Sequence, residues 1–158
     1  MKNIYLIGMP GCGKSTVAKI LAQKLNMSLA DTDSIIESKF GSIPEIFKMH
    51  GEQYFRKLET ETLKQIKDNT VVSTGGGIVK VEENTELMSK GIVVFIDTPP
   101  EVLKTRDLFE NRPLLKSNCD IEKLYNERYD LYKEQADITV DGNNSPMLVA
   151  KEIVKSVK

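Results

Sequence analysis

A glycine-rich stretch near the start of the chain has the composition of a phosphate-binding loop. Residues 8–16 read GMPGCGKST and fit the spacing G-x-x-x-x-G-K-[ST]. A short apolar run with strand character precedes it, and apolar residues at helical spacing follow it. Glycines let successive backbone N–H groups converge on phosphate oxygens, and the start of the following helix adds partial positive charge. The sequence therefore predicts a nucleoside triphosphate site made by Gly11, Cys12, Gly13, Lys14, Ser15 and Thr16.

Two side chains of this loop have distinct predicted roles. We expect Lys14 to reach the outer phosphates and the Ser15 hydroxyl to ligate Mg²⁺. The N-K-x-D base-reading signature of switch GTPases is missing from the sequence, and the chain is short for a motor protein. A kinase that phosphorylates a small molecule or a nucleotide is therefore the natural class.

Two aspartates could serve the acceptor of such a kinase. Asp31 and Asp33 lie two residues apart at the end of a predicted strand over 28–33, so in an extended chain they point the same way. One carboxylate could orient Mg²⁺ through water, and the other could accept a proton from a substrate hydroxyl. The alternative is that Thr32 or Asp33 caps a helix over 34–40.

Three arginines could bind anionic groups. Arg56 and Glu59 lie one helical turn apart and form either a surface ion pair or, in a pocket, a bidentate carboxylate site. Arg112 lies in an aperiodic segment over 110–118, which is typical of a mobile lid that brings charge to a transferred phosphoryl group; a solvated surface arginine is the alternative. Arg128 could bind an anion or pair with a neighbouring acid of its own segment, NERYDLY.

A second glycine-rich stretch, STGGGIVK at 73–80, differs from the first. It has neither the lysine nor the helix start at the spacing that a phosphate loop needs. A tight turn that requires positive φ is one interpretation. Three successive glycines are more than a turn demands, so we interpret Gly75, Gly76 and Gly77 as a floor on which the acceptor lies.

The elements that must position these residues alternate between strand and helix. Strands are predicted over 3–7, 28–33, 70–74, 92–97 and 137–140, and helices over 15–25, 34–40, 42–51, 52–67, from about 99, over 121–135 and toward the end of the chain. This alternation predicts a parallel sheet with helices on both faces, whose ligands bind beyond the carboxyl ends of the strands. Asp97, at the end of strand 92–97, resembles a Walker B acid, but we leave it out because TPP follows at once.

Composition limits the classes of partner. The chain has 158 residues, of which 40% are hydrophobic and 28% charged, as in a soluble single domain. A net charge of −1 gives no basic field for nonspecific nucleic-acid binding, and no apolar run reaches the ~20 residues of a membrane span. Cys12 and Cys119 form no CxxC motif, which favours free thiols in a reducing compartment. We expect a cytoplasmic monomer with no nucleic-acid or membrane partner.

The ordered set of motifs resembles the shikimate kinases. The matching segments are GMPGCGKST, ADTD, GEQYFRKLE, STGGG, NRPLL and ERYDLY, which together cover essentially the whole chain. The resemblance implies a single P-loop kinase domain over 1–158, a three-layer α/β/α fold with five parallel strands in the order 2-3-1-4-5, an acceptor-binding region at about 32–60 and a mobile lid at about 109–119. It also implies Mg-ATP-dependent phosphorylation of the 3-hydroxyl of shikimate, giving shikimate 3-phosphate and ADP for aromatic amino-acid biosynthesis.

The resemblance implies roles for individual residues. Ser15 and Asp31 would hold Mg²⁺, and Asp33 would bind and activate the acceptor hydroxyl, with Lys14 and Arg112 as the other catalytic groups. Arg56 and Arg128 would bind the shikimate carboxylate, with Glu59 steadying Arg56. The backbone at Gly75, Gly76 and Gly77 would also contact shikimate. Arg106 and Arg112 would contact ATP, and Pro146 would face the adenine.

Some features depart from the family pattern. The chain is somewhat short around the lid and before STGGG, and Pro10 and Cys12 stand where the family often has Met and a small residue. None of these changes removes a predicted ligand. The alternatives that stay open are another small P-loop kinase, such as a gluconate or nucleoside monophosphate kinase, and a nucleotide-binding module without catalysis.

Overall fold

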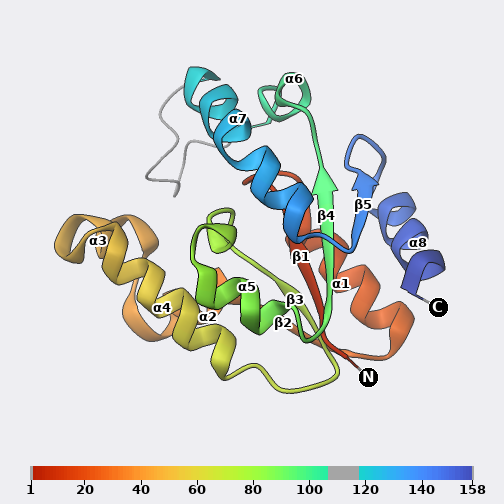
Figure 1. Cartoon of the computed structure of the whole chain (residues 1–158), viewed down its shortest axis with the longest axis horizontal. Coiled ribbons are helices and arrows are strands. Elements are labelled where there is room, and N and C mark those ends of the chain that lie inside the picture. The colour runs from red at the N-terminus through yellow and green to blue at the C-terminus, as the bar shows by residue number, and fades with distance from the viewer. Residues whose placement is uncertain (1, 107–117, 158) are drawn as a thin grey trace.

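The fold is a five-stranded parallel sheet with helices on both faces (Figure 1). The computed structural model describes residues 2–106 and 118–157. The strands lie in the order β2-β3-β1-β4-β5, and every neighbouring pair is parallel. Their bounds are β1 Ile4–Ile7, β2 Ser28–Asp31, β3 Thr70–Ser73, β4 Ile92–Asp97 and β5 Ile138–Asp141. The predicted fold class and strand order are confirmed.

The helices form the two outer layers. On one face α1 packs against α8, and α5 and α7 lie on the other face (Figure 1). The bounds are α1 Lys14–Leu25, α2 Thr32–Phe40, α3 Ile43–His50, α4 Glu52–Lys64, η1 (a 3₁₀ turn) Ile78–Lys80, α5 Glu82–Met88, α6 Pro100–Leu103, α7 Asn118–Gln135 and α8 Pro146–Val157. None of the helices within the described ranges is both long and apolar enough to cross a bilayer.

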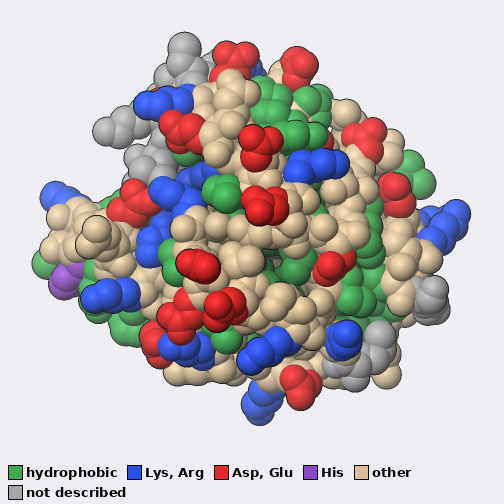
Figure 2. Space-filling model, viewed as in Figure 1, with side chains coloured by type: hydrophobic (Ala, Val, Ile, Leu, Met, Phe, Trp, Pro, Cys, Tyr) green, Lys and Arg blue, Asp and Glu red, His purple; other side chains and the backbone are tan. Residues whose placement is uncertain are grey.

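Burial follows the pattern that a covered parallel sheet requires. All residues of β1 and β3 are buried, because apolar side chains on both faces of these central strands meet helices. A second, smaller apolar cluster lies among α2, α3 and α4, with Ile36, Ile43, Ile46 and Phe55 at its centre. Acidic and basic side chains are interspersed over the face shown in Figure 2, in keeping with the net charge of −1.

Local chemistry explains where helices α3 and α4 begin and end. The Ser42 side chain caps α3 by accepting a hydrogen bond from the Glu45 N–H at 3.4 Å. Gly51, with φ of 86°, ends α3 and starts α4. These two signals place α4, which carries Arg56 and Glu59, against α3.

Three expectations about the elements need correction. Strand β2 ends at Asp31 rather than continuing to 33, because the Asp31 side chain accepts a hydrogen bond from the Ser34 N–H at 3.1 Å and caps α2. Helix α4 ends at Lys64 instead of residue 67. The predicted lid at 109–119 overlaps α7 at its last two residues, and its remainder, with Arg112, lies outside the described residues.

Candidate active site

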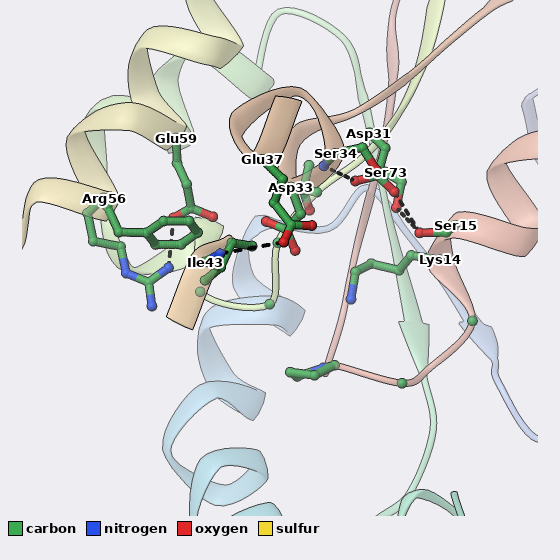
Figure 3. A pocket seen from close by; sticks show the side chains of 18 of the residues that line it. Lys14, Ser15, Asp31, Asp33, Ser34, Glu37, Ile43, Arg56, Glu59 and Ser73 are labelled. Atoms are coloured by element: carbon green, nitrogen blue, oxygen red, sulfur yellow. Dashed lines mark hydrogen bonds and ion pairs between the residues drawn. The ribbon is translucent and has the colours of Figure 1, made fainter. Parts of the chain in front are cut away.

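A cavity of about 460 Å³ lies at the carboxyl ends of the strands (Figure 3). It brings both glycine-rich stretches together, because β1 and β3, which precede them, are paired neighbours in the sheet. In the view of Figure 3, Asp33 lies between the Arg56–Glu59 pair on one side and Lys14 and Ser15 on the other. The predicted site residues that line the cavity are Gly11, Gly13, Lys14, Ser15, Thr16, Asp31, Asp33, Arg56, Glu59, Gly75, Gly76, Gly77 and Arg128.

The first glycine loop holds its own lysine in place. The Lys14 ammonium is buried and donates hydrogen bonds to the carbonyl oxygens of Gly8 at 2.7 Å and Met9 at 3.0 Å. Cys12, in the same loop, is buried, and its Sγ lies 3.7 Å from Lys14 Nζ. Its backbone N–H donates to the Met9 carbonyl at 3.1 Å. A bound phosphate would offer Lys14 stronger, charge-assisted acceptors than these carbonyls.

An oxygen-rich cluster lies beside the loop. The Ser15 hydroxyl donates to Asp31 Oδ2 at 2.7 Å, and its oxygen lies 3.4 Å from that of Ser73. Strand pairing sets this cluster, since Asp31 and Ser73 are partners in the β2–β3 ladder. The described residues contain no group of three or more His, Cys, Asp or Glu able to hold a metal ion. One carboxylate with hydroxyls suits Mg²⁺ that keeps waters and shares phosphate oxygens.

The two aspartates occupy different positions from those that the sequence predicted. Asp31 is the N-cap of α2, and Asp33 lies in the first turn of that helix, so they do not share one face of a strand. A residue of this segment does cap the helix, as the alternative predicted. The cap is Asp31, however, and not Thr32 or Asp33. The Thr32 hydroxyl instead accepts a hydrogen bond from the Gly75 N–H at 3.1 Å. Both aspartates still line the cavity.

Arg56 and Glu59 form a largely buried ion pair. Arg56 Nη1 donates to Glu59 Oε1 at 2.7 Å, and the side chains are 12% and 0% exposed, so the alternative of a surface ion pair is wrong. Arg56 Nε and Nη2 also donate to Glu52 Oε2 at 3.2 and 3.1 Å. The sequence analysis missed Glu52, although it lies one turn before Arg56 on the same helix.

Burial makes Glu59 an unusual acid. Removal of its carboxyl group from water raises its pKa to about 7, and the charge of Asp33 adds to the rise while Arg56 opposes it. Its second oxygen, Oε2, accepts no hydrogen bond within the described part of the chain. Burial thus favours the neutral form of Glu59, and the contact with Arg56 favours the charged form.

The three glycines make room for the site's own side chains. A Cβ at Gly75 would lie 2.5 Å from Glu59 Oε2 and 2.9 Å from Asp33 Oδ1. None of the three glycines has positive φ, so the interpretation as a turn that needs that conformation is wrong. Because Gly75 has no side chain, the carboxylates of Glu59 and Asp33 can both approach the loop.

The next two glycines admit cationic groups in the same way. A Cβ at Gly76 would lie 2.8 Å from Pro10 Cδ and 3.1 Å from Arg128 Nη1, and one at Gly77 would lie 2.5 Å from both Nη1 and Nη2 of Arg56. The glycines therefore do not form an open floor, because charged side chains lie against them. Two guanidinium groups, those of Arg56 and Arg128, border the loop.

Helix α7 supports the second glycine loop from the other side. Arg128 is 4% exposed, and among the described residues it forms no ion pair with Glu127 or Asp130. One turn later, the Tyr132 hydroxyl donates to the Gly76 carbonyl at 2.6 Å, and Gln135 Nε2 donates to the Val79 carbonyl at 2.9 Å. The sequence places Tyr132 only within the helix predicted over 121–135, because its spacing carries no information about a partner in a distant loop.

The other residues considered for the nucleotide lie away from the acceptor side. Arg106 Nη1 donates to the Gly11 carbonyl, so this arginine contacts the phosphate loop, although it does not line the cavity. Asp97 accepts a hydrogen bond from the Tyr125 hydroxyl at 2.8 Å and does not line the cavity either, in agreement with its omission.

Known proteins share both the sequence and the arrangement. The family model described as shikimate kinase matches residues 10–158. A shikimate kinase of Aquifex aeolicus is 47% identical over 99% of this chain and 96% of its own length, and one of Clostridium botulinum strain Eklund 17B is 46% identical over 96% and 95%. Among solved structures, shikimate kinase from Acinetobacter baumannii in complex with shikimate has a TM-score of 0.95 and 36% identity, covering 99% of this chain and 93% of that one. The chain belongs to the shikimate kinase family.

Proposed function

We propose that the protein transfers the γ-phosphoryl group of ATP to the 3-hydroxyl of shikimate, giving ADP and shikimate 3-phosphate. The observation that carries this proposal is one cavity lined by a phosphate loop and by two arginines, in which Asp33 lies between Lys14 and Arg56 (Figure 3). A phosphate loop alone serves many kinases, but paired buried arginines select an acceptor with a carboxylate. Membership of the family supports shikimate as that acceptor.

On the donor side, the backbone of residues 11–16 and the Lys14 ammonium bind the ATP phosphates. Ser15 and Asp31 would hold Mg²⁺, with Asp31 acting through water as the family resemblance implies, and the 2.7 Å contact between their side chains supports this assignment. When bound, Mg²⁺ neutralises charge on the phosphate oxygens during transfer. Arg106 steadies the Gly11 end of the loop near the nucleotide. The motif NRPLL supports Arg112 as the lid residue that meets charge on the moving phosphoryl group.

On the acceptor side, Arg56 and Arg128 bind the shikimate carboxylate, and the Gly76 backbone contacts the ring hydroxyls. This fixes the 3-hydroxyl next to Asp33, whose carboxylate accepts its proton as the oxygen attacks the γ-phosphorus. The bond from that phosphorus to the β–γ bridging oxygen breaks, and ADP leaves. Glu59 steadies Arg56 through their 2.7 Å ion pair.

A coupled assay of ADP release tests the function. With Mg-ATP, turnover is expected with shikimate and not with gluconate or nucleoside monophosphates, and chelation of Mg²⁺ should stop it until Mg²⁺ is restored. Turnover with gluconate alone or with a nucleotide alone would identify another small P-loop kinase. Nucleotide binding without turnover of any acceptor would indicate a noncatalytic module.

The setting of the enzyme is part of the same proposal. We infer a cytoplasmic, monomeric enzyme whose 158 residues form one domain with an acceptor-binding region and a lid. Size-exclusion chromatography with light scattering tests the monomer, since a dimer would double the 17.8 kDa mass.

A further inference from the structure

One carboxylate oxygen outside the cavity gathers three donors. Glu52 Oε2 accepts hydrogen bonds from Arg56 Nε at 3.2 Å, Arg56 Nη2 at 3.1 Å and Lys80 Nζ at 2.9 Å. Glu52 is the first residue of α4, and Lys80 is the last residue of η1, just beyond the triple glycine. Neither lines the acceptor cavity. Both line a separate hollow whose wall also includes Arg56, so they reach the acceptor only through that guanidinium.

A count of donors shows how this contact orients Arg56. A guanidinium has five N–H groups, one on Nε and two on each Nη nitrogen. Glu52 accepts those of Nε and one of Nη2, and Glu59 accepts one of Nη1. No other acceptor within the described residues bonds to Arg56. The groups left for a ligand are therefore one N–H on each Nη nitrogen, which together form the end of the guanidinium fork.

Gly77 lets the guanidinium lie directly against the loop. A Cβ at Gly77 would lie 2.5 Å from both Nη1 and Nη2 and 2.6 Å from Cζ, so any other residue there would collide with the flat face of the group and displace it. Arg56 and Gly77 both line the cavity. Glu52 and Glu59 thus hold two edges of the guanidinium and Gly77 lies against its flat face, which leaves the end formed by Nη1 and Nη2 for a carboxylate.

We propose that Glu52 and Lys80 form a positioning pair that fixes Arg56 so that it captures the acceptor carboxylate end-on, through Nη1 and Nη2. This inference rests on the proposed function, because it concerns how the carboxylate of that acceptor is bound. Lys80 holds Glu52, Glu52 holds the Nε side of Arg56, and Glu59 holds Nη1. The side chains of Glu52 and Lys80 are 35% and 42% exposed, so their ion pair alone stabilises little, and its effect is on geometry.

Two variants with opposite charge changes separate geometry from simple electrostatics. Glu52→Gln removes a negative charge and Lys80→Met removes a positive one. If only charge mattered, the first would tighten binding of the shikimate carboxylate and the second would weaken it. Positioning predicts that both weaken it, roughly tenfold for Glu52→Gln and less for Lys80→Met, with Kd for shikimate measured by calorimetry. The KM for ATP and kcat at saturating shikimate should stay near the wild-type values.

The double variant and a matched control complete the test. Because both residues act through one oxygen, Glu52→Gln/Lys80→Met should bind shikimate about as weakly as Glu52→Gln alone. Glu61→Gln is the control, since Glu61 is on the same helix and pairs with Lys64 instead of Arg56. Unchanged or tighter binding by Glu52→Gln, shifts of opposite sign, or equal losses for ATP would overturn the inference. Absence of shikimate turnover in the wild type would instead contradict the proposed function.

Discussion

Tyr132 donates a 2.6 Å hydrogen bond from its hydroxyl to the carbonyl oxygen of Gly76, the middle residue of the triple glycine. The tyrosine is fully buried, and its ring stacks on Phe95 of β4 at a centroid distance of 5.0 Å. Burial raises its pKa to about 12, so the hydroxyl keeps its proton at every physiological pH. A buried side chain of α7 that packs on the sheet is therefore hydrogen-bonded to the middle of the glycine loop.

Tyr132→Phe should weaken shikimate binding more than ATP binding. The substitution keeps the ring and removes only the hydrogen bond, so we expect a loss of about 1 kcal/mol in stability and a fall of about 2–4 °C in Tm. The Kd for shikimate should rise several-fold, as measured by calorimetry. Tyr129→Phe is the control, because the Tyr129 hydroxyl makes no hydrogen bond within the described ranges while its ring packs beside Phe95. Equal effects of the two variants would argue against a specific role for the hydroxyl.

Asp33→Asn should nearly abolish kcat and leave ATP binding largely intact. The amide keeps the shape of the side chain but accepts a proton far less readily than a carboxylate. Single-turnover kinetics with saturating Mg-ATP would measure the loss. Asp97→Asn serves as the comparison, since Asp97 is the last residue of β4 and does not line the cavity. If Asp33→Asn kept the wild-type kcat, Asp33 would have no role as a base.

Gly75→Ala should damage the acceptor site without straining the backbone. The new Cβ would lie 2.5 Å from Glu59 Oε2, so the buried carboxylate that pairs with Arg56 would have to move. Gly51→Ala gives the opposite pattern, because a Cβ there meets nothing within 4 Å but φ is +86°. We expect Gly75→Ala to raise the KM for shikimate by about tenfold or more, because small displacements of groups in a binding site have effects of this size. Gly51→Ala should lower Tm by a few degrees with normal KM, and a reversal of these two results would contradict the assignment.

Glu59→Gln should change how stability depends on pH. The folded protein holds the Glu59 proton up to a pKa of about 7, whereas the unfolded chain releases it near 4.5. The folded state then binds more protons, so this group makes wild-type stability fall as pH rises across that interval. Glutamine does not titrate, so the Tm of the variant minus that of the wild type should increase from pH 4.5 to 7 and then level off. Parallel curves, as expected for the exposed control Glu61→Gln, would show that the buried acid is not the cause.

Local patterns were enough to predict the frame and the phosphate loop. The spacing of residues 8–15 and the alternation of strands and helices need only neighbours in the sequence, and both are confirmed. The predicted end of β2 was wrong because residues 31–33 could either continue the strand or start a helix. The Asp31 cap favours the helix. The short elements η1 and α5 were not predicted at all.

Contacts between distant segments account for what the sequence could not show. The three glycines suggested open space. They are needed because the side chains of Glu59, Arg56 and Arg128, from two other helices, lie where a Cβ would be. Ser73 joins Ser15 and Asp31 only because the strand register aligns it with Asp31. No periodicity of a single segment contains such information, since it depends on which elements become neighbours after folding.

The alignment of β2 with β3 limits where the chain can change in length. Asn3 Oδ1 accepts a hydrogen bond from the Thr70 N–H at 2.9 Å, and the Ser28 N–H donates to the Asn69 carbonyl at 3.0 Å, so both strands are fixed at their first residues. Insertions and deletions in the turn before Asn69 leave this alignment intact. A deletion of one residue inside β3 would move every later side chain to the opposite face and carry Ser73 away from Ser15. Length variation in this enzyme should therefore accumulate in the turn and spare the strand, which makes the turn the safer place for an inserted tag or a shortened loop.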